Sequence, residues 1–386
     1  MIVGKLKYGV LLFFMIVSCA CIEQYDAEID EDHDLICFEA SLIKGEERQI
    51  LKISKASRLL NPELKTVSGC LAVIKDDQNN TYEYVEEAPG VYMLQIPDEA
   101  MKFDRLYKLH VITPEGIMYE SSWEHIERGA KVDTLYYKVE DKFDNIRQEM
   151  MQGIRFYIDI KTSDTLSRFF RWRLTETYEF TSIAPISYYL TGDPIAPSVS
   201  LDDEWEYYRC WMTREVKAFF LSSTNNLSVN EKNQIPLHYV NNQTDQLKIK
   251  YSLLVRQYPL SSEAYNYWEK VRYETKNPGG LYTRQPGQPI CNIANVDDED
   301  EVVLGYFWAS EMTKQRIIVP KPPSIEVQDN SCSLEAYDPN WHNAGPFPRY
   351  LWIDQVRGGT YTGPKECFNC VTKGGNLEKP DYWDNE

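Results

Sequence analysis

The residues with the clearest chemistry in this sequence are the cysteines near its start. Cys19 follows a basic start and an apolar run of about nine residues, Gly9 to Val17. A membrane-spanning helix needs roughly 20 apolar residues, so this run is too short to span and matches the core of a secretory signal. Ser18 before the cysteine and Ile16 three positions before it suit a lipoprotein signal peptidase. The sequence therefore predicts a signal peptide over residues 1–18.

Acylation of a cysteine would then anchor the mature chain to a membrane. Cys19 is the first candidate for the lipid, and Cys21 is the alternative because the small Ala20 precedes it. One acyl chain holds a protein only weakly, whereas two or three make the anchoring stable. Residues 19–34 are acidic and nearly free of large aliphatic side chains, which indicates a flexible tether. A plainly secreted protein is the other interpretation.

Four residues near the end of the chain could in principle bind a metal. Cys332, His342, Cys367 and Cys370 contain a C-x-x-C pair and two distant ligands, an arrangement known from zinc sites. Zinc thiolates are uncommon in exported proteins, where cysteines tend to be oxidised. We therefore favour a disulfide from Cys332 to either Cys367 or Cys370 and predict no metal site.

Two arginines alternate with apolar residues in a segment that reads as a strand. Arg171 and Arg173 would face the opposite side from Trp172. They could contact a carbohydrate or a carboxylate. The favoured interpretation is that both are solvent-facing charges paired with Glu176 or Glu179.

Composition and motifs narrow the classes of function. The net charge of −18 argues against nucleic-acid binding, and the content of 27 Tyr and 9 Trp suits β-sandwich cores or a binding surface. The sequence contains no H-E-x-x-H, G-x-S-x-G or G-x-x-x-x-G-K-[ST] motif, and its five histidines are scattered. We predict a protein that is not an enzyme and has no cofactor. A hydrolase built on two carboxylates without a local signature stays an alternative.

The elements that must position these residues are mainly strands. Period-two alternation and turn residues every 8–12 positions predict an immunoglobulin-like β-sandwich over residues 35–142. Cys37 and Cys70 could form a second disulfide across its sheets, or both could be buried thiols. Longer aromatic strands with long loops, Ala184 to Glu204 among them, predict a larger β-rich domain over 143–325, and binding usually lies on such loops.

One helix is expected near 261–276. Ser261 is a suitable N-cap, and Asn277-Pro278-Gly279-Gly280 would end the helix. An apolar stripe along it is expected to lie in the core, with these members: Ala264, Tyr267, Trp268 and Val271. Residues 326–386 are predicted to form a tail, rich in proline and cysteine, packed on the second domain.

Several motifs resemble those of a family of Bacteroidota lipoproteins called domain of unknown function 4249. The motifs that carry the resemblance are Cys21-Ile22-Glu23-Gln24-Tyr25, Pro89-Gly90-Val91-Tyr92, Arg256-Gln257-Tyr258, Gly279-Gly280-Leu281-Tyr282, Val303-Leu304-Gly305-Tyr306-Phe307 and Lys379-Pro380-Asp381-Tyr382-Trp383. The family register places the lipid on Cys21, although Gln24 stands where the family usually has proline.

The resemblance implies a location and a partner but no catalytic residues. Such proteins tend to be encoded beside a TonB-dependent outer-membrane transporter, and acidic residues after the cysteine can mark export to the cell surface. We therefore expect an outer-membrane lipoprotein, lipid-anchored and facing the exterior or the periplasm, that captures or gates the substrate of such a transporter. The alternatives are a surface hydrolase acting on peptide or glycan and a structural envelope lipoprotein.

Overall fold

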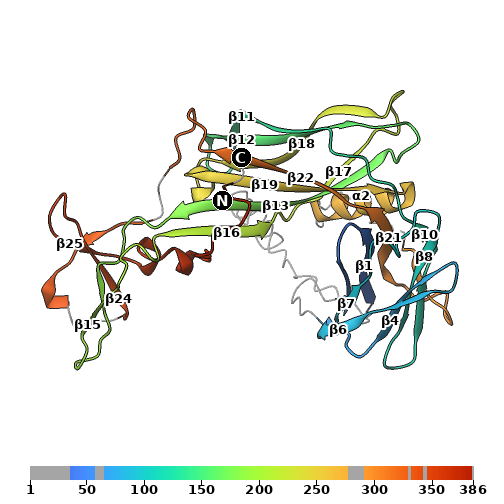
Figure 1. Ribbon diagram of the computed structural model, residues 1–386, viewed down its shortest axis with the longest axis horizontal. Helices are drawn as coiled ribbons and strands as arrows, with labels where there is room; N and C mark the ends of the chain where they lie inside the picture. The colour runs from blue at the N-terminus through green and yellow to red at the C-terminus, as the bar shows by residue number, and fades with distance from the viewer. Residues whose placement is uncertain (1–34, 57–64, 277–290, 329–331, 342–345, 385–386) are drawn as a thin grey trace, which may run out of the picture. The chain divides into compact units, whose positions relative to one another are not determined.

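The computed structural model describes residues 35–56, 65–276, 291–328, 332–341 and 346–384. Within them the protein is mainly β, with several sheets and one α-helix (Figure 1), as the alternation of the sequence predicted. The predicted signal peptide, the acidic tether and both candidate acylation sites, Cys19 and Cys21, lie outside the described residues.

Two six-stranded sheets form the first region. The first sheet contains, in spatial order, β21 (Leu304–Glu311), β1 (Ile36–Lys44), β2 (Arg48–Lys55), β7 (Val91–Gln95) and β6 (Val85–Ala88), with β3 (Lys65–Thr66) beside β2. The second contains β20 (Ile293–Asn295), β9 (Met118–Ser121), β8 (Leu106–Ile112), β4 (Leu71–Asp76) and β5 (Thr81–Glu83), with β10 (Glu124–His125) beside β8. One apolar core contains side chains of both sheets, Phe38 and Leu109 among them, so the sheets face each other.

The boundaries of this region differ from the predicted 35–142. Strand β21 returns from far along the chain to pair in parallel with β1, and β20 pairs with β9. At the other end, β11 (Thr134–Asp144) pairs with the next region instead. Parallel strands need a long crossover connection, and here that connection contains strands β2–β10 and β20 of the first region and most of the second region. Local periodicity carries no information about such a distant pairing.

The possible disulfide between Cys37 and Cys70 is absent, and both cysteines are free thiols, of which Cys70 is buried and Cys37 is partly buried. Cys37 follows the buried Ile36 and precedes the buried Phe38, so its side chain points away from the core. Cys70 belongs to that core. The two thiols therefore lie on opposite sides of the first sheet.

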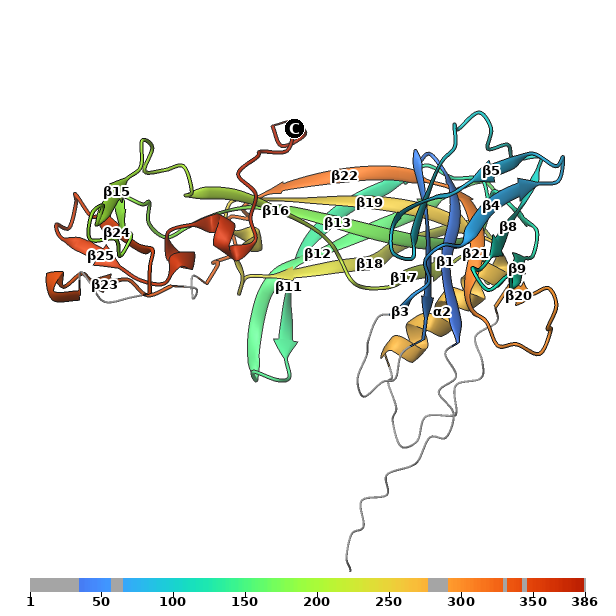
Figure 2. The ribbon, with the colours of Figure 1, turned by 90° about the horizontal axis from the view of Figure 1, so that it is seen from below.

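The second region consists of two sheets that share another core. The three-stranded sheet has the order β11, β12 (Glu149–Lys161), β18 (Glu231–Asn241). The five-stranded sheet has the order β16 (Arg209–Glu215), β13 (Phe169–Thr181), β19 (Lys250–Leu260), β22 (Thr313–Pro320), with β17 (Phe220–Ser223) beside β13. Figure 2 shows the long strands β12, β13, β19 and β22 running alongside one another. Phe156 from one sheet and Trp172 from the other meet in the core.

Helix α2 (Ser262–Lys276) begins directly after β19, one residue from the predicted start. The Ser261 hydroxyl accepts a hydrogen bond from the backbone N–H of Ala264 at 3.1 Å, which confirms the predicted N-cap. Leu260 and Tyr265 share one apolar cluster with Trp308 of β21. The helix thereby packs against strands of both regions.

A third group of strands joins the predicted tail to the loop near residue 190. Its order is β15 (Ser198–Ser200), β14 (Tyr188–Leu190), β24 (Arg349–Ile353), β25 (Thr360–Thr362) and β23 (Glu335–Ala336). Short 3-10 turns complete the description: η1 (Asp245–Leu247), η2 (Pro339–Trp341), η3 (Lys365–Cys367) and η4 (Cys370–Lys373). The segment 326–386 is thus not simply a tail on the second domain, because three of its strands build this separate sheet.

Two disulfides fasten the C-terminal segment. Cys332 is joined to Cys367, one of the two pairings favoured from the sequence. Cys370 is joined to Cys210 of β16, a partner that the sequence did not suggest. Disulfide sulfurs are not thiolate ligands, so the three cysteines of the zinc alternative are occupied otherwise, and His342 lies outside the described residues.

Candidate functional site

A cavity of about 1000 Å³ lies over the outer face of the five-stranded sheet, the face that points away from the shared core. It adjoins a second cavity of about 420 Å³, and both are lined by Arg171 and Arg173. We call the two together the basic cleft. Seven cationic side chains line the larger cavity: Arg48, Lys52, Arg171, Arg173, Lys217, Arg256 and Lys314. Only three glutamates line it, in a chain whose net charge is −18.

Strand alternation explains why these charges converge. Along β13, Trp172 and Leu174 point into the shared core, so Arg171 and Arg173 point outward. The strand register places Arg173 opposite Arg256 of β19, and Arg256 opposite Lys314 of β22. Three adjacent strands therefore carry a row of like charges. Like charges directly opposite each other in a sheet are destabilising, so an anion bound beside this row would stabilise the sheet.

Arg171 is the most unusual residue of the cleft, because its cationic side chain is 7% exposed. Its guanidinium lies 3.5 Å from the ring centre of Trp268 and 5.5 Å from that of Trp308. Its Nη1 atom is buried and has no hydrogen-bond partner among the described residues. Burial, together with the nearby charge of Arg173, lowers the pKa of Arg171 to about 9. The side chain is still cationic at neutral pH, and an adjacent anion would stabilise that charge.

The other cations of the cleft divide into paired and unpaired groups. Arg48 contacts Glu87 at 2.8 Å, and Lys52 contacts Glu39 at 3.0 Å. These pairs are exposed, and such pairs contribute little stability. Within the described chain, no ion pair is formed by Arg171, Arg173, Lys217 or Lys314.

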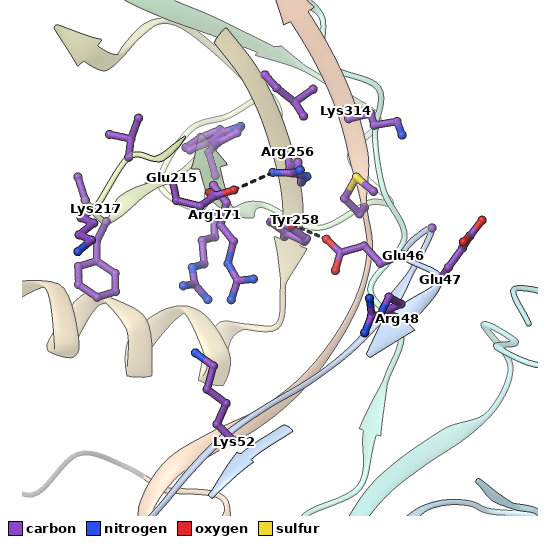
Figure 3. Close-up of a pocket in the computed structure, with 18 of the residues that line it drawn as sticks. Glu46, Glu47, Arg48, Lys52, Arg171, Glu215, Lys217, Arg256, Tyr258 and Lys314 are labelled. Carbon is purple, nitrogen blue, oxygen red and sulfur yellow. Dashed lines mark hydrogen bonds and ion pairs between the residues drawn. The ribbon is translucent and has the colours of Figure 1, made fainter. Parts of the chain in front are cut away.

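Two carboxylates of the cleft accept hydrogen bonds from neighbouring strands (Figure 3). Glu46 Oε1 accepts from the Tyr258 hydroxyl at 2.8 Å. Glu215 Oε1 lies 3.5 Å from Arg256 Nη1 and accepts from the Thr175 hydroxyl at 2.6 Å. Both carboxylates therefore connect neighbouring segments of the cleft wall.

The inner face of β13 carries a buried charge that, unlike Arg171, has several hydrogen-bond partners. Glu176 is 2% exposed, and its Oε2 accepts hydrogen bonds from Tyr251 at 2.6 Å and Gln246 at 2.9 Å. Oε2 also lies 3.2 Å from His238 Nε2, and Oε1 accepts from Arg214. Burial alone would raise the pKa of Glu176, but bonds from His238, Tyr251 and Arg214 outweigh it and lower the pKa to about 2.

The favoured prediction for the two arginines is therefore wrong for Arg171; Arg173 is exposed, as expected, but pairs with neither glutamate in the described chain. Glu176 is on the other face of the strand, and Glu179 contacts Arg209 at 3.0 Å and Trp383 Nε1 at 2.8 Å. Arg171 is buried against aromatic rings instead of facing solvent. The alternative, contact with a carbohydrate or a carboxylate, fits the placement of Arg171 beside a cavity better.

The helical stripe is only partly in the core. Ala264 is buried, but Tyr267, Trp268 and Val271 line the smaller cavity of the cleft. The expected stripe is thus also a wall of the site. Lys217, Arg256 and Lys314 were not singled out from the sequence. For Arg256 and Lys314 the signal was available only in combination, as basic residues that a correct strand register would align with Arg173; Lys217 lies between two strands, outside this register.

The loop from Ala184 to Glu204, expected to carry binding residues, contains strands β14 and β15 and does not line the cleft. No helix in the described ranges is long and apolar enough to span a membrane. Over the same part of the chain, no group of three or more His, Cys, Asp or Glu side chains is arranged to bind a metal.

Comparisons with known proteins give one extensive match. The family model described as "Domain of unknown function (DUF4249)" matches residues 22–316. No curated protein matches the chain. Among solved structures, trypsin-activated alpha-2-macroglobulin from Escherichia coli aligns over 59% of this chain and 14% of its own, at 10% identity and a TM-score of 0.18. A likeness that weak supports no conclusion about fold or function.

Proposed function

The chain belongs to the DUF4249 family, and on that premise we propose that it is an accessory binding lipoprotein of a TonB-dependent outer-membrane transporter. In this role it captures the substrate of the transporter, and the basic cleft is the ligand site. The lipid is carried by Cys19, with Cys21 as the alternative, and the mature protein faces the cell exterior.

The single observation that carries the binding role is the unpaired charge of the cleft. A buried cation without a counter-ion costs free energy in the empty protein. Arg171 is such a cation, and it lies in a cavity of about 1000 Å³, the size range of small-molecule sites. The cost is explained if the site exists to bind an anionic group.

The membrane location rests on the lipoprotein signal, and the transporter rests on what the family resemblance implies. Binding is favoured over hydrolysis because seven cationic side chains and only three glutamates line the larger cavity. Two of those glutamates, Glu46 and Glu215, also accept hydrogen bonds from the side chains of Tyr258 and Thr175 in the cleft walls.

The proposal is tested by purifying the tagged full chain from native outer membranes in mild detergent. Recovery of a TonB-dependent barrel in a stoichiometric amount would support the accessory role. Recovery of the lipoprotein alone would contradict a stable complex.

The variants Cys19→Ser and Cys21→Ser identify the anchor in the same preparation. The lipid-bearing cysteine is the one whose replacement abolishes acylation and membrane association. If both variants stay in the membrane fraction, neither cysteine alone is the anchor.

A further inference from the structure

We infer that the basic cleft binds a small organic molecule that carries at least two oxyanion groups, such as carboxylates, sulfates or phosphates. The inference rests on the proposal that this cleft is the ligand site and adds the chemical class of the ligand. Three features of the cleft lead to it: a buried arginine, a separate row of cations, and an aromatic wall.

The first oxyanion group is bound by Arg171. Its guanidinium carbon lies 3.5 Å from the ring centre of Trp268, which holds the group in place, and Nη1 has no partner among the described residues. A planar guanidinium with free N–H groups matches the two oxygens of a carboxylate or phosphate. Low exposure strengthens such a contact because the surroundings are less polarisable than water.

The second group is bound by the row formed by Arg173, Arg256 and Lys314. Arg173 follows Arg171 by two positions on the same face of β13, which separates their Cα atoms by about 7 Å. The row continues sideways across two more strands, with neighbouring strands roughly 4.8 Å apart. One small inorganic ion cannot reach both Arg171 and the far end of this row, whereas a molecule with two or three anionic groups can.

The walls indicate an organic ligand rather than inorganic polyphosphate. Phe219, Trp268 and Trp308 line the smaller cavity, and Phe219, Leu254 and Met312 line the larger one. These side chains offer apolar surface to a carbon skeleton between the anionic groups. The net charge of −18 repels long polyanions, so a nucleic acid or an anionic polysaccharide chain is disfavoured.

The test is a calorimetric titration of the full chain with acetate, succinate and citrate at one ionic strength. We expect citrate to bind more tightly than succinate, and succinate more tightly than acetate. The double variant Arg256→Gln/Lys314→Gln should weaken citrate binding about 10-fold or more, because it removes two charge-assisted contacts. Its acetate binding should change much less.

The matched control is Lys142→Gln/Arg147→Gln, which removes the same charge at exposed positions on the β11–β12 hairpin. It should bind citrate like the wild type. No citrate binding by the wild type, equal affinity for the three anions, or equal loss in the control would each overturn the inference.

The outcomes separate this inference from the proposed function. A chain that recovers the transporter but binds none of the anions would overturn the ligand class alone. A chain that binds citrate through the cleft but recovers no transporter would overturn the accessory role and leave the ligand class standing.

Discussion

Two buried charged side chains on strand β13 differ in whether the protein provides polar partners for them. Glu176 points into the shared core and is contacted by four polar side chains from three other strands and a 3-10 turn. Arg171 points to the other face, is almost as buried, and has no carboxylate partner in the described chain. A buried charge that is fully hydrogen-bonded stabilises the scaffold, whereas one left without a partner marks a place where a ligand supplies it.

The outer face of the five-stranded sheet also has one end with paired polar groups and one end with unpaired cations. At one end, the Tyr382 hydroxyl is 2.9 Å from that of Thr177, and Trp383 is buried with its N–H on Glu179. Near Arg173 the same face is open to a cavity. The C-terminal motif thus satisfies the polar groups of one end and leaves the cationic end available.

The largest effect is expected from Glu176→Gln. Removing one partner of a buried charge network leaves the other groups unsatisfied, and we expect the free energy of unfolding to fall by about 3 kcal/mol. Urea denaturation measures the change. The control is Glu231→Gln, at a partly exposed position whose carboxylate lies 3.8 Å from Lys161; it should change the same free energy by about 0.5 kcal/mol or less. Equal losses in the two variants would remove the distinction between Glu176 and a surface charge.

The charged state of Glu176 should also affect how the free energy of unfolding depends on pH. The pKa of Glu176 is lowered from 4.5 to about 2 in the folded protein. A lowered carboxyl pKa stabilises the folded state above its unfolded value, and that contribution is lost as pH falls from about 4.5 to about 2. The wild type should therefore lose stability over this range more steeply than Glu176→Gln. Parallel curves for the two proteins would show that the carboxylate is not held in its charged form.

The smallest effect is expected from the like charges of the cleft. Arg173→Gln removes the central repulsion between β13 and β19, so the empty protein should gain about 0.5 kcal/mol in its free energy of unfolding. The measurement is urea denaturation without added anions, with Arg147→Gln as the control for loss of one positive charge. A loss of stability would mean that Arg173 is already paired in solution.

Local pattern predicted much of this fold. The alternation of Phe156, Ile158 and Ile160, and of Phe170, Trp172 and Leu174, corresponds to β12 and β13. These features follow from neighbouring residues. Pairings between distant segments do not, and the parallel contact of β1 with β21 escaped prediction for that reason.

Only some residues of the candidate site could be predicted from the sequence. Alternation predicts that Arg171 and Arg173 lie together on one face of a strand. The same pattern is typical of an ordinary strand with one face in solvent. What distinguishes Arg171 is the cover from Trp268 of α2 and Trp308 of β21, which lie about 95 and 135 positions further along the sequence. The register that adds Arg256 and Lys314 is also a property of the folded sheet.

The most direct test of the account compares citrate binding and stability in Arg171→Met. Replacing a buried ion by an apolar side chain of similar length is neutral or stabilising, so we predict that the free energy of unfolding stays unchanged or rises by about 1 kcal/mol. Citrate affinity should fall about 10-fold or more because the stacked guanidinium is lost. Unchanged citrate affinity in a folded Arg171→Met protein would contradict the claim that the unpaired charge of the cleft is a ligand site.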